Sequence, residues 1–235
     1  MKIAVFGDSY AADYDRNFTR YPGWVERLRR LEPTWIIDNH ARHGSSFWYS
    51  WSQFGQRSSQ YDHIIVFVTH WDRHTFYTNS GPDPWCHMPG IRNVQSAIDT
   101  FPQHIRPSVR ALEQYWLLVD QEQQRQEQHD LMLANIQQLA PGALIVPCFN
   151  WEGSRLASPS QTTIQDISDM DIPLELRQDF YQKYNCERTN HMNELNLDLM
   201  ALTMKTWVLT GQLDWDSQPW GADTQRPLDY YFKRI

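Results

Sequence analysis

The stretch KIAVFGDS, residues 2–9, decides how the rest of this chain is interpreted. Its apolar run, ending at Phe6, is typical of a buried strand, and Gly7 allows a sharp turn directly after it. Ser9 then stands at the carboxyl end of an opening strand, which is where open α/β sheets hold their ligands. Gly, Asp and Ser are also ordinary turn formers, so the tripeptide gains meaning only from residues further along the chain.

Strand and helix patterns alternate after this start, which favours a parallel sheet covered on both faces. Further strands are predicted at residues 35–37, 63–68 and 143–146, and a fifth would lie between residues 152 and 185. Helices are predicted at residues 21–31, after the Gly44-Ser45-Ser46 turn, and at residues 193–209. The expected fold class is α/β: a three-layer αβα, flavodoxin-like domain with a doubly wound parallel sheet of four to five strands.

Composition favours one globular domain spanning residues 1–235. The formal net charge of −7 argues against nucleic acid or an anionic membrane as the main partner. No stretch approaches the roughly 20 apolar residues that span a bilayer, and the N-terminal apolar run is too short for a signal peptide. Three widely spaced cysteines imply no disulfide framework, so a cytoplasmic protein is expected.

Three segments depart from a minimal α/β domain. Residues 71–107 are rich in Pro, Gly, Asn and aromatic residues, which favours a lid or a side wall. Residues 109–140 are predicted to be helical, but the wholly polar run 120–130 predicts that this arm projects into solvent or breaks in two. The aromatic tail, residues 211–235, is expected to wrap the domain. The arm and the tail are also candidate surfaces for a homo-oligomer or a structural partner.

The chain offers the parts of a nucleophilic site in loops that should follow consecutive strands. A serine hydroxyl needs a base, usually histidine, to take its proton, and it needs donors aimed at the developing oxyanion. Ser9 follows the first strand, Gly44 the second and residues 69–72 the third, while His191 precedes the last helix. In a doubly wound sheet these loops converge along the carboxyl edge.

These residues resemble the SGNH (GDSL-type) hydrolases along the length of the chain, in short islands. Gly7-Asp8-Ser9 is similar to the first block of that family, which implies that Ser9 is the nucleophile and that its amide is an oxyanion donor. Gly44 is similar to the second-block glycine, whose amide is the second donor. His191 is similar to the fifth-block catalytic histidine.

The third block departs from the family pattern, which normally reads Gly-x-Asn-Asp. Here the residues are Thr69-His70-Trp71-Asp72, so Trp71 stands where the donating Asn is expected. Either His70 or the Trp71 indole N–H is then the substitute donor, with Asp72 in support. Loss of one oxyanion donor typically costs about 10²–10³ in turnover.

The fifth block also departs, because the family places Asp three residues before the histidine. Arg188 occupies that position here, with Glu187 one residue further back. Either Glu187 orients His191, or a backbone carbonyl holds the ring of a Ser-His dyad. Asp8 is expected to cap the turn that follows it or to anchor a loop. Variant sites of this kind resemble the divergent SGNH-like proteins of bacteriophage genomes.

Two functions of different classes are consistent with this pattern. The first is a serine esterase that acts on a small-molecule or carbohydrate ester through an acyl-enzyme and needs no cofactor. The second is a catalytically decayed scaffold of the same fold that serves as a binding or structural module. The missing third-block Asn and fifth-block Asp are the changes that such decay would leave.

Two further alternatives have weaker support. His70 and His74 lie four residues apart, with Asp72 between them and Cys86-His87 nearby, but the segment looks like loop and the spacing is not diagnostic of a metal site. A nucleotide-binding domain of the flavodoxin type is disfavoured, since no Gly-rich phosphate fingerprint follows any strand.

Overall fold

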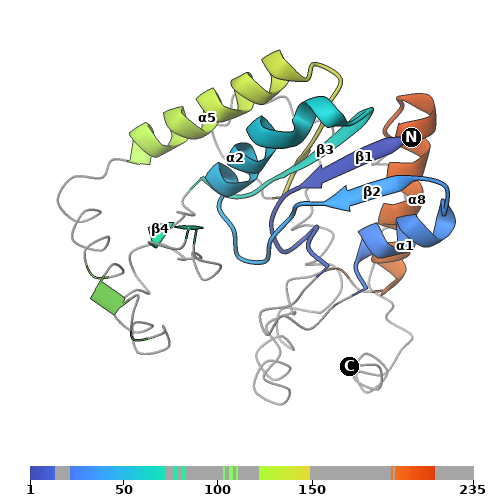
Figure 1. Ribbon diagram of the computed structural model, residues 1–235, viewed down its shortest axis with the longest axis horizontal. Helices are drawn as coiled ribbons and strands as arrows, with labels where there is room; N and C mark the ends of the chain where they lie inside the picture. Colours follow the sequence, from blue (N-terminus) through green and yellow to red (C-terminus); the bar gives the residue numbers. More distant parts are fainter. Residues whose placement is uncertain are drawn as a thin grey trace.

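The structure is a computed structural model of residues 1–235, and most of the residues that it describes belong to an α/β body (Figure 1). It describes residues 1–13, 22–71, 122–148 and 194–214, together with the short or single positions 77–78, 81–82, 103, 106–107, 110 and 192. The fifth strand expected between residues 152 and 185 lies outside these ranges.

A parallel sheet of four strands forms the centre of the described body. The strands are β1 (Lys2–Phe6), β2 (Ile36–Asn39), β3 (His63–Val68) and β6 (Leu144–Pro147), in the order β2-β1-β3-β6. This order is that of a flavodoxin-like doubly wound sheet, in which the winding direction reverses between the first and third strands. The predicted fold class is therefore confirmed.

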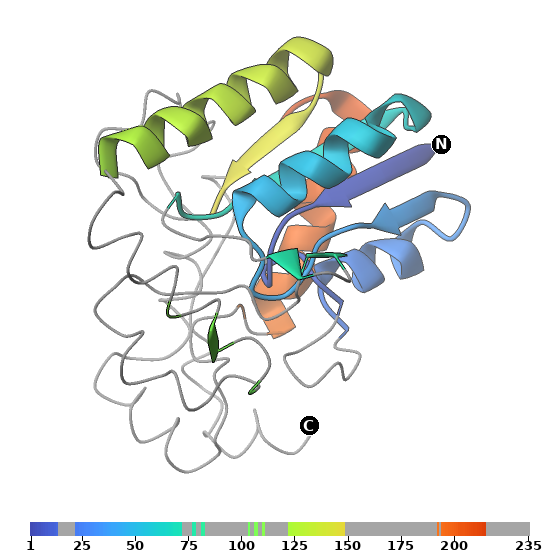
Figure 2. The ribbon, with the colours of Figure 1, turned by 60° about the vertical axis from the view of Figure 1, so that its left-hand side comes forward.

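Helices cover both faces of the sheet and make three layers (Figures 1 and 2). Helices α1 (Trp24–Leu31) and α8 (Glu194–Thr210) lie on one face, and α2 (Phe47–Arg57) and α5 (Glu122–Leu139) lie on the other. The short elements are the 3-10 turn η1 (Ser58–Gln60) and the antiparallel pair β4 (Tyr77–Thr78) and β5 (Gly81–Pro82). That pair falls inside the segment predicted to be a lid or side wall, most of which lies outside the described residues.

The apolar runs in the strands serve two cores at once, because successive strand residues point to opposite faces. In β1, Ile3 and Val5 belong to the core beneath α1 and α8, whereas Ala4 and Phe6 belong to the core beneath α2 and α5. β3 divides in the same way and is buried on both faces. This is the physical reason that both strands are apolar after their first residue, as in other parallel sheets.

Helix α5 covers the second half of the predicted polar arm 109–140, of which residues 111–121 lie outside the described part of the chain. It runs without interruption from Glu122 to Leu139 and packs on α2. Leu133 and Ile136 are buried in the shared core, and Trp51 Nε1 of α2 donates to Asn135 Oδ1 at 3.0 Å. A narrow inward stripe of apolar residues is enough to dock a helix, even when the rest of its surface is polar.

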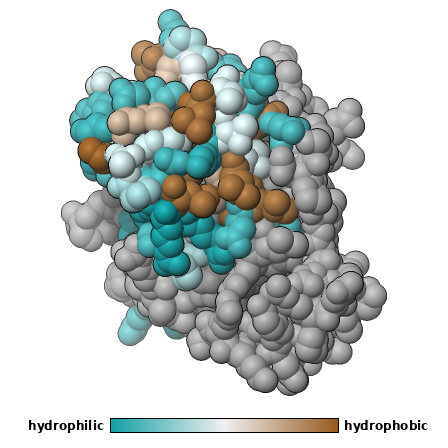
Figure 3. All heavy atoms as spheres, turned by 90° about the vertical axis from the view of Figure 1, so that its right-hand side faces the viewer, coloured by the Kyte–Doolittle hydropathy of each residue, from teal (hydrophilic) through white to brown (hydrophobic). Residues whose placement is uncertain are grey.

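The helical spacing of Leu195, Leu199, Leu202 and Trp207 predicts that these residues face inward in α8, and the structure contradicts this prediction at Leu202. Leu202 is 47% exposed, whereas Met200 and Met204 are fully buried and Trp207, as expected, is buried. Because this helix is apolar around much of its circumference, its composition does not determine which stripe faces the sheet. Figure 3 looks onto the side where α1 and α8 lie and shows apolar residues scattered among polar ones. Within the described residues, no helix has both the length and the apolarity to cross a membrane.

Candidate active site

The loop after β1 begins with a glycine that no other residue can replace without movement. A Cβ atom added to Gly7 would lie 2.7 Å from Cβ of Phe67 on the neighbouring strand β3. The chain then makes a helical turn in which the amides of Ala11 and Ala12 donate to the Asp8 carbonyl at 3.1 and 3.0 Å. Ser9 is the first residue after Asp8 in this turn, and it is half-buried. The close approach of β1 to β3 therefore places the serine at the carboxyl edge of the sheet.

Asp8 lies beneath this turn with its side chain fully buried. Its Oδ1 accepts a hydrogen bond from the Tyr10 amide at 3.1 Å, which closes an Asx turn around Ser9. The thiol Sγ of Cys148, the residue that follows β6, lies 4.0 Å from the same oxygen. Asp8 thus braces the main chain on either side of the serine, and its carboxylate faces inward.

The loop after β2 is attached to the first loop through the carbonyl of Gly7. The Arg42 amide donates to this oxygen at 3.0 Å, and the Ser45 hydroxyl donates to it at 3.1 Å. Gly44 lies between these two contacts and has a φ of 71°, a left-handed conformation that favours glycine. Its left-handed turn leads into α2, whose N-cap Ser46 accepts from the Tyr49 amide.

Two main-chain donors are left available in these adjoining loops. In the described part of the chain, neither the amide of Ser9 nor that of Gly44 donates a hydrogen bond to any carbonyl or side chain. Buried backbone N–H groups usually donate a hydrogen bond within the protein. Backbone N–H groups that do not are the usual donors to the oxyanion in sites of acyl transfer. These two amides belong to loops that are joined at the Gly7 carbonyl.

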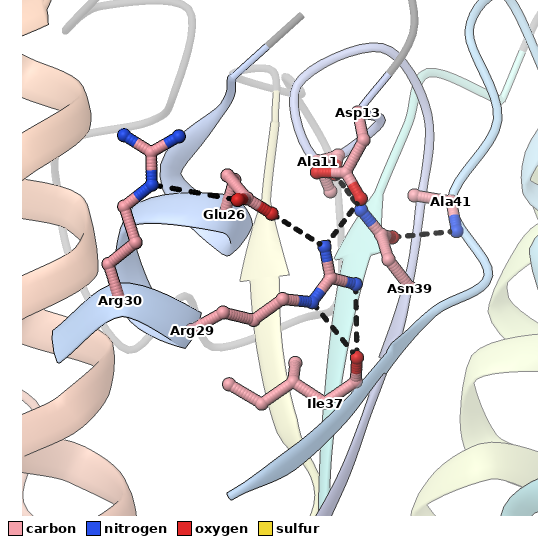
Figure 4. Close-up of polar contacts among 8 residues, drawn as sticks. All are labelled: Ala11, Asp13, Glu26, Arg29, Arg30, Ile37, Asn39 and Ala41. Carbon is pink, nitrogen blue, oxygen red and sulfur yellow. Dashed lines mark hydrogen bonds and ion pairs between the residues drawn. The ribbon is translucent and has the colours of Figure 1, made fainter. Parts of the chain in front are cut away.

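A network of side chains holds the segment that follows Ser9 (Figure 4). Arg29 of α1 donates from Nε and Nη2 to the Ile37 carbonyl at 3.2 and 3.0 Å, and from Nη1 to Asp13 Oδ2 at 3.0 Å. Glu26 accepts a longer contact from the same nitrogen at 3.4 Å. The guanidinium therefore ties the end of the serine loop to strand β2.

Asn39, the last residue of β2, joins the first two loops directly. Its Nδ2 donates to the Ala11 carbonyl at 2.7 Å, and its Oδ1 accepts from the Ala41 amide at 3.0 Å. Both ends of the carboxamide are used, one toward the serine loop and one toward the Gly44 loop. The sequence reasoning did not single out Asn39, although a polar residue at the end of a strand is a recognisable signal.

The loop after β3 is attached to α5. Thr69 is buried, and its carbonyl accepts a hydrogen bond from His129 Nε2 at 3.2 Å. The rings of His70 and Trp71 lie 5.0 Å apart between centroids. The Arg125 guanidinium lies over the indole of the loop, 5.0 Å from the Trp71 ring centroid.

His129 is a buried histidine that the sequence reasoning missed. Burial lowers the pKa of His129 to about 4, the Thr69 carbonyl opposes this shift, and the nearby His70 adds to it. Its ring packs against Phe47 of α2 with centroids 4.5 Å apart. Its burial fits the helical spacing of the sequence, since residues 129, 133 and 136 lie on the same face of the helix.

Several predicted site residues lie outside the described part of the chain. These are His191, Glu187, Arg188 and Asp72. The described residues thus bring together Asp8, Ser9, Gly44, His70 and Trp71 on the loops after β1, β2 and β3. Of the residues weighed for a metal site, only His70 is described.

No known family model matches the sequence, and no curated protein matches it. Solved structures that resemble this one include the lipase/acylhydrolase from Enterococcus faecalis, with a TM-score of 0.39 and 13% identity over 91% of this chain and 97% of that one. A member of the lipolytic G-D-S-L family from Veillonella parvula has a TM-score of 0.39 and 15% identity over 90% of this chain and 99% of that one.

The acetyl xylan esterase AlAXEase has a TM-score of 0.32 and 11% identity, over 89% of this chain and 100% of that one.

Proposed function

We propose that this protein is a serine hydrolase that cleaves a small-molecule or carbohydrate ester through an acyl-enzyme. Ser9 is the nucleophile and His191 its general base. The amides of Ser9 and Gly44 bind the oxyanion. Glu187 orients the imidazole of His191, and the reaction requires no cofactor.

The observation that carries this proposal is that the loops of Ser9 and Gly44 meet at the Gly7 carbonyl, at the switch point of the sheet, and that neither residue's amide donates a hydrogen bond within the described residues. The order β2-β1-β3-β6 puts the winding reversal between β1 and β3, and ligands of such sheets bind outside the carboxyl ends at that point. Ser9 follows β1, and His70 and Trp71 follow β3. A carbonyl bound there would meet a hydroxyl and main-chain donors together.

In the proposed reaction Ser9 Oγ attacks the ester carbonyl carbon while His191 takes the hydroxyl proton. The negative charge that develops on the carbonyl oxygen is stabilised by the two amides. The carbon–oxygen bond to the alcohol then breaks, and His191 returns the proton to the leaving oxygen. Water hydrolyses the acyl-enzyme by the same steps in the second half of the reaction.

The assignment of His191 is supported by its position in the chain. Met192, the next residue, is buried in the core cluster that also contains Tyr10 and Ala11. Those two residues directly follow Ser9 in the turn that presents it. Met192 therefore lies in the core on the face of the sheet where Tyr10 and Ala11 also pack.

A third oxyanion donor comes from the loop after β3 in this proposal. The family pattern has an Asn carboxamide there, and this chain has His70 and Trp71 in its place. Both side chains carry a ring N–H that can donate. The positive charge of Arg125 beside Trp71 favours a developing oxyanion at this loop.

The decisive experiment uses a fluorophosphonate probe and p-nitrophenyl acetate on the full chain. We expect covalent labelling at Ser9, and we expect Ser9→Ala to lose both the labelling and at least about a thousandfold of kcat, since the nucleophile carries most of the rate. His191→Ala should lose turnover to a comparable degree.

Ser59→Ala is the matched control. Ser59 is exposed in η1, which precedes β3 and so lies away from the carboxyl edge. This variant should label and turn over like the wild type. A folded wild-type protein that neither labels nor hydrolyses the ester would refute the enzyme and favour the binding or structural scaffold.

A further inference from the structure

The inner face of α5 makes two contacts to one short loop. His129 Nε2 lies 3.2 Å from the Thr69 carbonyl, and Arg125, one helical turn earlier, lies over the Trp71 ring. Residues four apart on a helix share a face, so both contacts come from the same side of α5. Thr69 and Trp71 flank His70 on either side.

We infer that α5 is a positioning element for the proposed hydrolase, with His129 and Arg125 holding the loop after β3 in the geometry that presents its oxyanion donor. This inference rests on the proposed function for its catalytic consequence. The physical contact between helix and loop is independent of that function.

The contact with His129 has a defined direction. A carbonyl only accepts, so the His129 ring donates from Nε2, and the neutral tautomer with its proton on Nε2 is the one required. Burial against Phe47 keeps the ring in place, and the depressed pKa keeps it neutral at physiological pH. The donor therefore neither rotates away nor changes its charge during turnover near neutral pH.

The described part of the loop after β3 is restrained at its start and from α5. Val68, the last residue of β3, is joined to β6 through the Cys148 amide, which donates to its carbonyl at 3.0 Å. Further along, His129 binds the Thr69 carbonyl and Arg125 lies over the Trp71 ring. The side chains of α5 therefore restrain the residues on both sides of His70.

The test compares His129→Leu with His129→Gln on p-nitrophenyl acetate. Leu removes the donor and keeps an apolar side chain, whereas the Gln amide N–H can reach the same carbonyl. We expect His129→Leu to lower kcat about tenfold to a hundredfold with KM changed less than about twofold, because small displacements of a catalytic group cost rates of this order. His129→Gln should recover most of the loss.

Leu133→Ala is the matched control for packing. Leu133 lies one turn further along α5, is 1% exposed, and touches the shared core only as an apolar side chain. At a temperature at which circular dichroism shows all variants folded, it should lose clearly less kcat than His129→Leu, because it keeps the hydrogen bond to the Thr69 carbonyl. An equal loss of kcat in Leu133→Ala and His129→Leu would overturn the inference, as would equal losses in the Gln and Leu variants.

A second readout separates this inference from the proposed activity. Hydrogen–deuterium exchange of the peptide covering residues 69–71 should accelerate about tenfold or more in His129→Leu and stay near the wild-type rate in His129→Gln. Unchanged exchange in His129→Leu would overturn the positioning role. A wild-type protein that is inactive and unlabelled by the fluorophosphonate would refute the hydrolase, while the exchange comparison would still decide the role of α5.

Discussion

The two loops on either side of the switch point are held by different means. The loop after β1 is fixed by a glycine packed against β3, by its own Asx turn, and by Asn39 from the adjacent strand. The loop after β3 is held by side chains of α5, with His129 reaching Thr69 from 60 residues further along the chain. One loop is restrained several times over by near neighbours. The described part of the other is contacted by side chains of a helix distant in the sequence.

This difference implies that the two halves of the site respond differently to substitution. Changes around the serine loop disturb the strand packing itself and should reduce stability and activity together. Changes on α5 should act on the loop after β3 while leaving the serine and its amides in place. Substitutions in each half can test whether this separation holds.

The largest effect is expected at Gly7. In Gly7→Ala the new methyl group would lie 2.7 Å from Cβ of Phe67, an atom attached directly to the backbone of β3. The strands must move apart, so we expect a loss of about 3 kcal/mol or more in the free energy of unfolding, at the upper end of overpacking effects. Urea denaturation followed by circular dichroism measures it.

Gly142→Ala provides the comparison for that experiment. Nothing lies within 4 Å of a Cβ added at Gly142, so this variant should stay close to the wild type. A Gly7→Ala protein as stable as Gly142→Ala would show that the β1 and β3 backbones are not packed as tightly as described.

The second-largest effect is expected from acidification, which should lower the free energy of unfolding through His129 on α5. The pKa of His129 is lowered to about 4 from the ordinary 6.5, chiefly by burial. Between these two pH values, His129 is protonated in the unfolded chain but neutral in the folded chain. The free energy of unfolding therefore falls as the pH drops from 6.5 to 4. The expected loss from this residue is about 2 to 3 kcal/mol by about pH 4.

The nearby His70 side chain, from the loop after β3, lowers the pKa of His129 further. Chemical denaturation at several pH values should show a shallower pH dependence for His129→Gln than for the wild type. Parallel curves for the two proteins would contradict the buried neutral state.

Removal of the Asn39 side chain should have a smaller effect, on the serine half. Asn39→Ala leaves the Ala11 carbonyl and the Ala41 amide without their partner. An unsatisfied buried group costs about 1–3 kcal/mol, and we expect about 2 kcal/mol here because the site is half-buried. Activity on p-nitrophenyl acetate should fall as well, since this carboxamide links both oxyanion loops.

Asn39→Asp separates the two hydrogen bonds. The carboxylate still accepts from the Ala41 amide but no longer donates to the Ala11 carbonyl. We therefore expect an intermediate loss of stability. An Asn39→Asp protein with wild-type stability would show that the bond to Ala11 contributes nothing.

The smallest effect is expected at Arg125. Arg125→Ala removes a cation–π contact to Trp71 from a partly exposed side chain, which is worth about 0.5–1 kcal/mol. Arg125→Lys should lose less than Ala, because it keeps the charge near the ring. Thermal unfolding measures the change in stability, and kcat on p-nitrophenyl acetate measures the change in activity. A loss of stability larger than that of Asn39→Ala would reverse the expected ranking of the two loops.

The positions of the central strands could be predicted from local patterns. Apolar runs such as Ile3 to Phe6 and Ile64 to Val68 are long enough and sharply enough bounded to specify buried strands, and the alternation with helices specifies a parallel sheet. Gly7, Ser9 and Gly44 stood out for the same reason, because their places directly follow strands. The role assigned to His191 stays a prediction.

The faces of the helices could not be predicted in this way. Helix α8 is apolar on too many sides for Leu202 or Met204 to be chosen from spacing, and the contact with the sheet selects Met204. In α5 the polar run around His129 conceals an inward stripe that continues through Leu133. Which stripe is buried depends on the surface that it meets, and that surface is built from distant segments.

Local sequence thus accounts for the strands, their parallel arrangement and the serine at the end of the first one, because period-2 burial and turn chemistry act between near neighbours. Pairing His129 with Thr69 and Asn39 with Ala11 required the folded chain. Such contacts join segments that meet only after the sheet is assembled, and hydrogen bonds of this kind leave no periodic signature in the sequence.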